Sequence, residues 1–182
     1  MHRFHGLYSY HITYVQGLSA AVLAVLIAIV CGIIMGAFNG FASNLLKIHP
    51  MIVTLATMTM FNGIAFTLSE SKSFFDFPEA FINIGQGSLG PISFPIIFAI
   101  IVAIIMHFIL EMTCFGRFIY AAGGNPEAAR LAGINVARIK VAVFAIGGFL
   151  FAISSLILTA RGGSCNANTG SGVAFDAITA CV

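Results

Sequence analysis

The chain has 182 residues, of which 59% are hydrophobic and only 8% are charged. An ordinary soluble domain carries roughly 25% charged residues and must keep a wetted surface, so this composition excludes a soluble domain and predicts that lipid surrounds much of the chain. The formal net charge of +2 is too small, and the basic residues are too dispersed, to indicate a nucleic-acid partner.

The N-terminal stretch MHRFHGLYSYHITYVQG, residues 1–17, lacks the charged region, short apolar core and cleavage site of a signal peptide. Its His2, His5 and His11 have two interpretations, as metal ligands or as solvated residues of an interfacial lead-in to the membrane. Because no carboxylate or cysteine accompanies them, we expect the lead-in, and neither a metal site nor a cofactor.

Four segments after the lead-in are apolar and long enough to cross a bilayer, which takes about 20 residues of helix. We therefore predict an all-α integral membrane protein, a polytopic bundle with about four transmembrane helices. The predicted spans are residues 18–38, 51–68, 94–112 and 141–160.

Small residues recur every four positions along the first predicted span. A stripe of this kind lets two helix backbones approach closely, which favours helix association in lipid. The stripe predicts packing either inside the bundle or at a subunit contact. Its members are Ala24, Ala28, Gly32, Gly36 and Gly40.

The second predicted span begins beside Pro50, a residue suited to the first position of a helix. The pair Asn62-Gly63 weakens its middle. Two explanations stay open: the helix faces protein or a water-filled cavity, or Gly63 simply lets a neighbour pack closely.

The positions of the basic residues predict how the chain is oriented in the membrane, because positive charge favours the cytoplasmic side. Arg117, Arg130, Arg138 and Lys140 all lie between the third and fourth spans. We therefore expect residues 114–140 in the cytoplasm, and residues 69–93, residues 161–182 and the N-terminus outside.

The stretch AAGGNPEAARLAGINVARIK, residues 121–140, predicts a short helix within this cytoplasmic loop. Pro126 suits its first position, Glu127 suits the positive end of the helix dipole, and Gly133 suits the C-terminal cap. A helix of two turns is too short to be stable alone and must be held by packing. Its Ala-rich face is shaped to enter a groove on a partner; the alternative is a helix resting on lipid headgroups.

The same stretch contains PEAARLAG, which resembles the EAA-type cytoplasmic loop of ABC importer permeases. KIHPMIVTLATMTMFNGIAFTLS, CFGRFIYAAGGNPEAARLAGINVARIKV and LTARGGSCNANTGSGVAFDAITACV resemble the monosaccharide branch of that family, from about residue 18 to the end. The resemblance implies that residues 18–182 are the central portion of a multi-pass permease of the bacterial inner membrane.

The resemblance also implies partners: a second permease subunit in a homodimer, a periplasmic sugar-binding protein and a separate ABC ATPase subunit. The chain itself is then not an enzyme, and it has no G-x-x-x-x-G-K-[ST] motif with which to bind ATP. The predicted short helix becomes the coupling helix that is seated in a cleft of the ATPase. Its expected contact residues are Asn125, Pro126, Glu127, Ala128, Ala129, Arg130, Leu131 and Gly133.

A sugar path needs uncharged hydrogen-bonding side chains, and we expect Thr54, Thr57 and Asn62 of the second span to provide them. The alternative is that the threonine hydroxyls bond to carbonyls of their own helix. Two other functions stay open, a permease fragment that transports nothing and an ungated solute channel.

An intramembrane protease is the enzyme alternative, with Ser171 of the stretch TGSG as nucleophile and His107 as base. The predicted topology puts these two residues on opposite sides of the membrane, which excludes a hydrogen bond between them.

The four cysteines have no C-x-x-C spacing, so we expect incidental thiols over a disulfide between Cys165 and Cys181.

Overall fold

The computed structural model describes the backbone of residues 2–70, 79–89 and 92–165, and of residues 170, 172–173, 177 and 179–180. Only the backbone is described for residues 2–21 and for a few residues between 79 and 92. The elements in chain order are α1 (His2–Leu46), α2 (Pro50–Ser69), α3 (Glu79–Gln86), β1 (Ser88–Leu89), β2 (Ile92–Ser93), α4 (Phe94–Met112), α5 (Cys114–Gly124), α6 (Pro126–Leu131) and α7 (Val136–Gly162).

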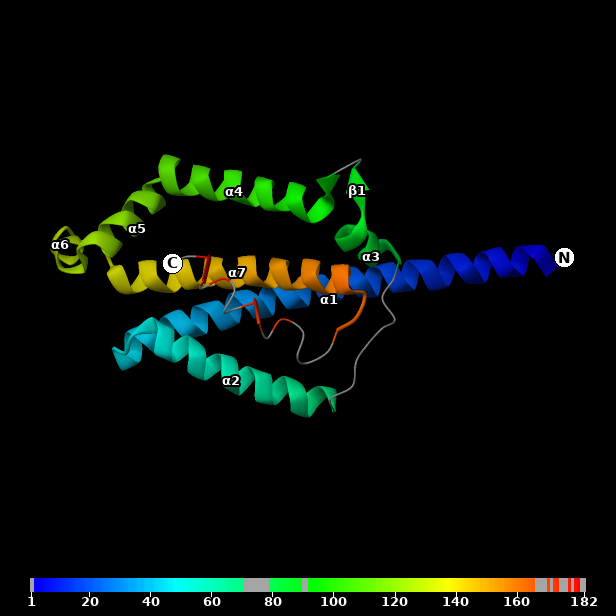
Figure 1. The fold of residues 1–182 in the computed structure, drawn as a ribbon, viewed down its shortest axis with the longest axis horizontal. Coiled ribbons are helices and arrows are strands. Elements are labelled where there is room, and N and C mark those ends of the chain that lie inside the picture. The colour runs from blue at the N-terminus through cyan, green and yellow to red at the C-terminus, as the bar shows by residue number, and fades with distance from the viewer. Residues whose placement is uncertain are drawn as a thin grey trace.

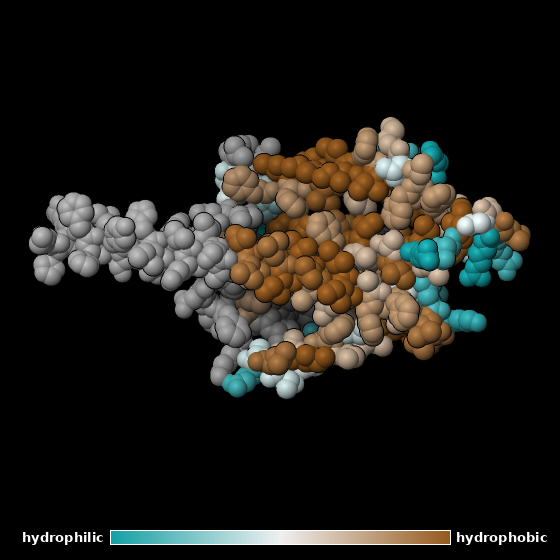
Figure 2. All heavy atoms as spheres, turned by 180° about the vertical axis from the view of Figure 1, so that it is seen from behind, coloured by the Kyte–Doolittle hydropathy of each residue, from teal (hydrophilic) through white to brown (hydrophobic). Residues whose placement is uncertain are grey.

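Four of these helices are long and apolar enough to cross a membrane: α1 over Val22–Leu46, and α2, α4 and α7 over their whole lengths. The predicted all-α class with four spans is therefore confirmed. At most 11% of the most apolar stretch of any of the four is buried within the described part of the chain. Hydrophobic side chains accordingly cover the visible outer face, and hydrophilic ones gather at the end that carries α5 and α6 (Figure 2).

The first helix is continuous from His2 to Leu46 and so contains both the predicted lead-in and the first predicted span. Whether residues 2–17 lie at the membrane interface stays a prediction. The helix ends in a tight turn, where the Ser43 hydroxyl donates to the carbonyl of Ile48 over 3.2 Å and Lys47 has a φ of 54°. Pro50 then starts α2, in the first-turn position expected from its missing N–H.

The main contact of the bundle is between α1 and α7, which run antiparallel (Figure 1). A Cβ added to Gly32 would lie 2.6 Å from the Cβ of Ala152, and one added to Gly40 would lie 2.9 Å from the Cα of Val141. Further along the seam, Asn44 Nδ2 of α1 donates to the carbonyl of Ala137 over 2.9 Å. Backbones this close require glycine at the crossing.

Helices α4 and α5 meet at Thr113, which ends one helix and caps the next. Its hydroxyl donates to the carbonyl of Ile109 and accepts from the N–H of Gly116 over 3.2 Å. Gly116 is buried, and an added Cβ would clash with the carbonyl group of Leu110. The sharp change of direction between the two helices (Figure 1) therefore depends on this pair of residues.

At the opposite end of the bundle, α3 packs against the last turn of α7. Gly85 lies against Ala160, and Gln86 Nε2 donates to the carbonyl of Arg161 over 3.1 Å. The short strands β1 and β2 follow α3 and pair antiparallel, with Ser88 opposite Ser93. This small cap was not predicted from the sequence.

The alternation of the helices places α5, α6 and the turn after α1 at one end, and α3 with the strands at the other (Figure 1). The residues predicted to be cytoplasmic thus gather at one end, together with Lys47. Which end faces the cytoplasm stays a prediction.

Candidate functional site

Helix α6 spans Pro126–Leu131 and is closed at both ends by local hydrogen bonds. The side-chain oxygen of Asn125 accepts from the N–H groups of Glu127 and Ala128 over 3.1 and 3.0 Å. These two donors have no partner inside the helix, so the N-cap satisfies them.

The C-terminal end of α6 is a Schellman motif centred on Gly133. The N–H of Ile134 donates to the carbonyl of Ala129, and that of Gly133 to the carbonyl of Arg130, both over 3.0 Å. Gly133 has a φ of 82°, a left-handed conformation in which other residues are strained. A short helix ending at Gly133 was predicted, and this is the local geometry that produces it.

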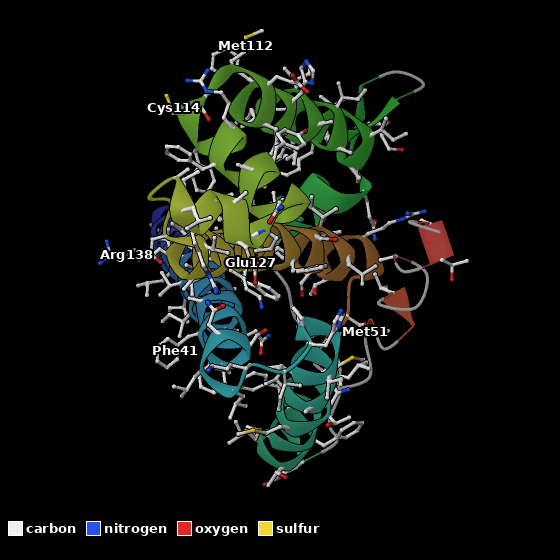
Figure 3. All side chains as sticks on the ribbon, turned by 90° about the vertical axis from the view of Figure 1, so that its left-hand side faces the viewer. Phe41, Met51, Met112, Cys114, Glu127 and Arg138 are labelled. Atoms are coloured by element: carbon white, nitrogen blue, oxygen red, sulfur yellow. The ribbon has the colours of Figure 1, made fainter. Side chains whose placement is uncertain are left out.

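One face of α6 is held by the fold and the other is open. Ala129 is only 4% exposed and α6 contacts both α5 and α7, whereas Leu131 is 91% exposed. Glu127 and Arg130 are also exposed, at the ends of the helix where their charges suit its dipole. Figure 3 looks onto this end of the bundle, with Glu127 toward the viewer.

Of the three predicted path residues on α2, only Thr54 lines the groove that the described residues form between α1 and α7. Thr54 Oγ1 donates to the carbonyl of Met51 over 3.0 Å. Thr57 is buried, and its Oγ1 donates to the carbonyl of Val53 over 3.0 Å. Both threonines thus have the alternative geometry, a bond to their own helix, and a substrate role for them and for Asn62 stays a prediction.

Gly63, next to Asn62, has open space around it in the described structure, since an added Cβ would meet nothing within 4 Å. Close packing of a neighbour against this glycine, one of the two explanations left open, is therefore not observed here.

A groove of about 630 Å³ follows the seam between α1 and α7, beside the start of α2. Three residues of the predicted stripe, Ala28, Gly32 and Gly36, line the groove, while Ala24 is exposed further along α1. Its polar side chains come from three helices and are Asn39, Thr54 and Ser155.

Sequence reasoning predicted Thr54 but gave no role to Asn39 or Ser155. The available signal was spacing: Asn39 follows Gly36 by three positions and so lies on the same face of the helix as the glycine stripe. Ser155 had no comparable signal, because its position in the groove follows from the register between α1 and α7.

No group of three metal-ligating side chains is found among the described residues. Cys31, Cys114 and Cys165 carry free thiols. His107 lies in α4, while Thr169, Ser171 and Cys181 lie outside the described residues, so neither the protease pair nor the Cys165–Cys181 pairing is formed by described positions.

Comparison with known proteins matches residues 4–182 to the family described as the permease component of the branched-chain amino acid transport system. The chain is 38% identical over 164 residues to the ribose import permease protein RbsC of Haemophilus influenzae, an alignment that covers 88% of this chain and 51% of that protein. It is 38% identical over 144 residues to the L-arabinose transport system permease protein AraH of Escherichia coli, covering 79% of this chain and 44% of AraH.

A third relative is the xylose transport system permease protein XylH of Escherichia coli, 31% identical over 221 aligned residues that cover 88% of this chain and 56% of XylH. The chain thus spans about half the length of the curated relatives it matches. No solved structure matches it. With four apolar helices and a family match over nearly its whole length, the chain belongs to this family of transport permease components and is a multi-pass protein of the bacterial inner membrane.

Proposed function

We propose that this chain forms the membrane-spanning path of an ATP-driven monosaccharide importer, and that α6 couples it to a separate ATPase subunit. In this proposal residues 114–140 are cytoplasmic, the permease acts as a homodimer, and a periplasmic sugar-binding protein delivers the solute from outside. The names of the similar permeases, which specify ribose, arabinose and xylose, support a sugar over an amino acid.

The observation that carries the coupling role is the exposed Leu131 on a helix whose other face is anchored. Covering the Leu131 side chain, which is 91% exposed, with a partner protein would remove its apolar surface from water and stabilise the contact. Because Ala129 is buried and both ends of α6 are capped, a force on Leu131 moves the whole helix.

The connections of α6 direct such a movement into two spans. Only Asn125 separates α6 from α5, which continues into α4, and residues 132–135 join α6 to α7. A displacement of α6 therefore reaches α4 and α7 without passing through a long loop. The permease does no covalent chemistry in this scheme: binding of ATP and of the loaded sugar-binding protein shifts it between two packed states.

The coupling role is tested by co-purification with the ATPase subunit of a monosaccharide importer, after co-expression with this chain. Leu131→Ala removes the exposed side chain and leaves the backbone of α6 intact. Burial of a leucine contributes about 1.5–3 kcal/mol, so the affinity for the ATPase should fall by about tenfold to hundredfold. The matched control is Leu68→Ala at the other end of the bundle, where the leucine is 80% exposed. Equal retention of the ATPase by both variants would contradict the proposal.

The ungated channel is separated from the importer by removing residues 123–134. A coupled importer should still insert in the membrane but lose ATP-dependent uptake of radiolabelled sugar into vesicles, whereas a channel should keep its flux. A chain that binds the ATPase but transports neither a sugar nor the free amino acid leucine would be the non-transporting portion of a permease.

A further inference from the structure

We propose that the groove between α1, α2 and α7 is a binding site for a neutral, hydroxylated solute of monosaccharide size, with Asn39 and Ser155 as its hydrogen-bonding residues. This proposal rests on the transport function above and names where the solute binds. It differs from the path predicted along α2, of which Thr54 alone reaches the groove.

Asn39 is the strongest indication that the groove holds a polar ligand. It lies within the apolar span of α1, and its Oδ1 is buried without a hydrogen-bond donor. The Asn39 side chain forms no hydrogen bond with any described residue, so exchanging the amide oxygen and nitrogen would leave the same lack of partners. An unsatisfied polar group within an apolar span is costly, and a turn of the Asn39 side chain into the groove, where a ligand that supplies hydroxyl groups can bond to the amide, removes this cost.

Ser155 and Thr54 extend the polar lining on the other two helices. The Ser155 side chain is exposed, and its hydroxyl has no partner among the residues that the structure describes. Thr54 Oγ1 already donates to Met51 and keeps a lone pair with which to accept. The three side chains therefore offer both donors and acceptors, which is what a sugar hydroxyl needs.

The remaining lining decides the chemical class of the ligand. None of the described lining residues is charged, so the groove has no partner for the carboxylate or ammonium group of an amino acid. Phe144 and Phe151 add apolar faces against which the C–H side of a sugar ring can pack. A groove of about 630 Å³ with apolar walls and a few convergent polar groups is typical of small-molecule sites.

The test measures whether water and sugar reach Cys31, a natural thiol that lines the groove and is exposed. Cys114, Cys165 and Cys181 are replaced by alanine, and the remaining thiol is labelled in membranes with a charged methanethiosulfonate offered on both sides. In the two reference chains Cys31 is also replaced by alanine, and the single cysteine is Leu131→Cys, at a position 91% exposed on α6, or Ile104→Cys, at a position 63% exposed on the apolar helix α4. The proposed hydrogen-bonding residues Asn39 and Ser155 stay unchanged in these chains.

We expect Cys31 to react nearly as fast as Leu131→Cys and far faster than Ile104→Cys. D-ribose, L-arabinose, D-xylose or D-galactose should slow the labelling of Cys31 and leave that of Leu131→Cys unchanged, and L-leucine should slow neither. Adding Asn39→Leu should raise the sugar concentration that halves the labelling rate by about twofold to tenfold, which is the loss of affinity expected when one hydrogen bond is removed. Asn39→Ser, which puts a hydroxyl in place of the amide, should lose less.

Two results would overturn the site. Labelling no faster than at Ile104→Cys would mean that lipid or another helix fills the groove, and labelling that none of the four sugars slows would mean that water alone enters it. Neither result depends on α6 or on an ATPase. A failure of the groove and a failure of the coupling role therefore remain distinguishable.

Discussion

Replacing Gly32 by alanine tests the α1–α7 seam most directly, because the structure specifies what the added methyl group would meet. The new Cβ would lie 2.6 Å from the Cβ of Ala152 and 2.7 Å from the carbonyl oxygen of Gly148. Neither obstacle is a flexible side chain that can turn away. Since carbon atoms in contact prefer about 3.5–4.0 Å, the two helices must separate by about 1 Å.

The expected cost of Gly32→Ala follows from comparison with Gly63→Ala in α2. Both substitutions gain about 0.5–1 kcal/mol from the lower backbone entropy of alanine. At Gly63 nothing lies within 4 Å of the added Cβ, so this gain stands alone. At Gly32 overpacking costs about 1–3 kcal/mol, and the two variants should differ in stability by that amount.

The assay is thermal denaturation of the full chain in detergent micelles, followed by gel filtration with fluorescence detection. For a chain of this size about 1 kcal/mol corresponds to about 2–4 °C, so Gly32→Ala should denature about 2–12 °C below Gly63→Ala at one heating rate. Adding Ala152→Gly removes one of the two obstacles and should restore part of the loss. Equal denaturation temperatures for Gly32→Ala and Gly63→Ala would refute the α1–α7 packing described here.

Three further substitutions are followed by hydrogen exchange of backbone amides. Asn125→Ala removes the N-cap of α6, which contributes about 0.5–2 kcal/mol to the stability of the helix. Amide exchange in the first turn of α6 should therefore become about twofold to thirtyfold faster. An unchanged exchange rate would show that the cap is not needed. Gly133→Ala puts a side chain at a φ of 82° and should destabilise the C-terminal end of α6 by about 1–2 kcal/mol. The control Gly123→Ala should not speed amide exchange there. Equal exchange rates in the two variants would argue against the Schellman motif. Gly85→Ala should push α3 off α7 and speed exchange throughout α3, whereas Gly162→Ala, with open space around it, should not; slow exchange in both would contradict the contact between these helices.

Features that depend on a few neighbouring residues were readable in the sequence. The four apolar spans follow from length and composition alone, because a helix must satisfy its own backbone in lipid. The short helix after Pro126 follows from signals within about ten residues: the proline itself, a Glu in the first turn and Gly133 at the end. The hydrogen bonds that close the two ends of this helix, at Asn125 and Gly133, join residues at most five positions apart.

Other features were missed because their signals are weaker or not local. Residues 114–124 were predicted only as part of a loop, yet they form α5, which starts from the Thr113 cap. The short α3 and the two strands are too brief to stand out from a polar loop, and contact with the end of α7 stabilises them.

What only the tertiary structure decided is which faces meet. The sequence determined that α1 carries a stripe of small residues, but not whether the stripe meets another helix of the same chain. The structure places Gly32, Gly36 and Gly40 against α7, residues more than 100 positions away. The groove containing Asn39 and Ser155 exists only because of that antiparallel register, since a helix presents residues on every side and its partner selects the side that is buried.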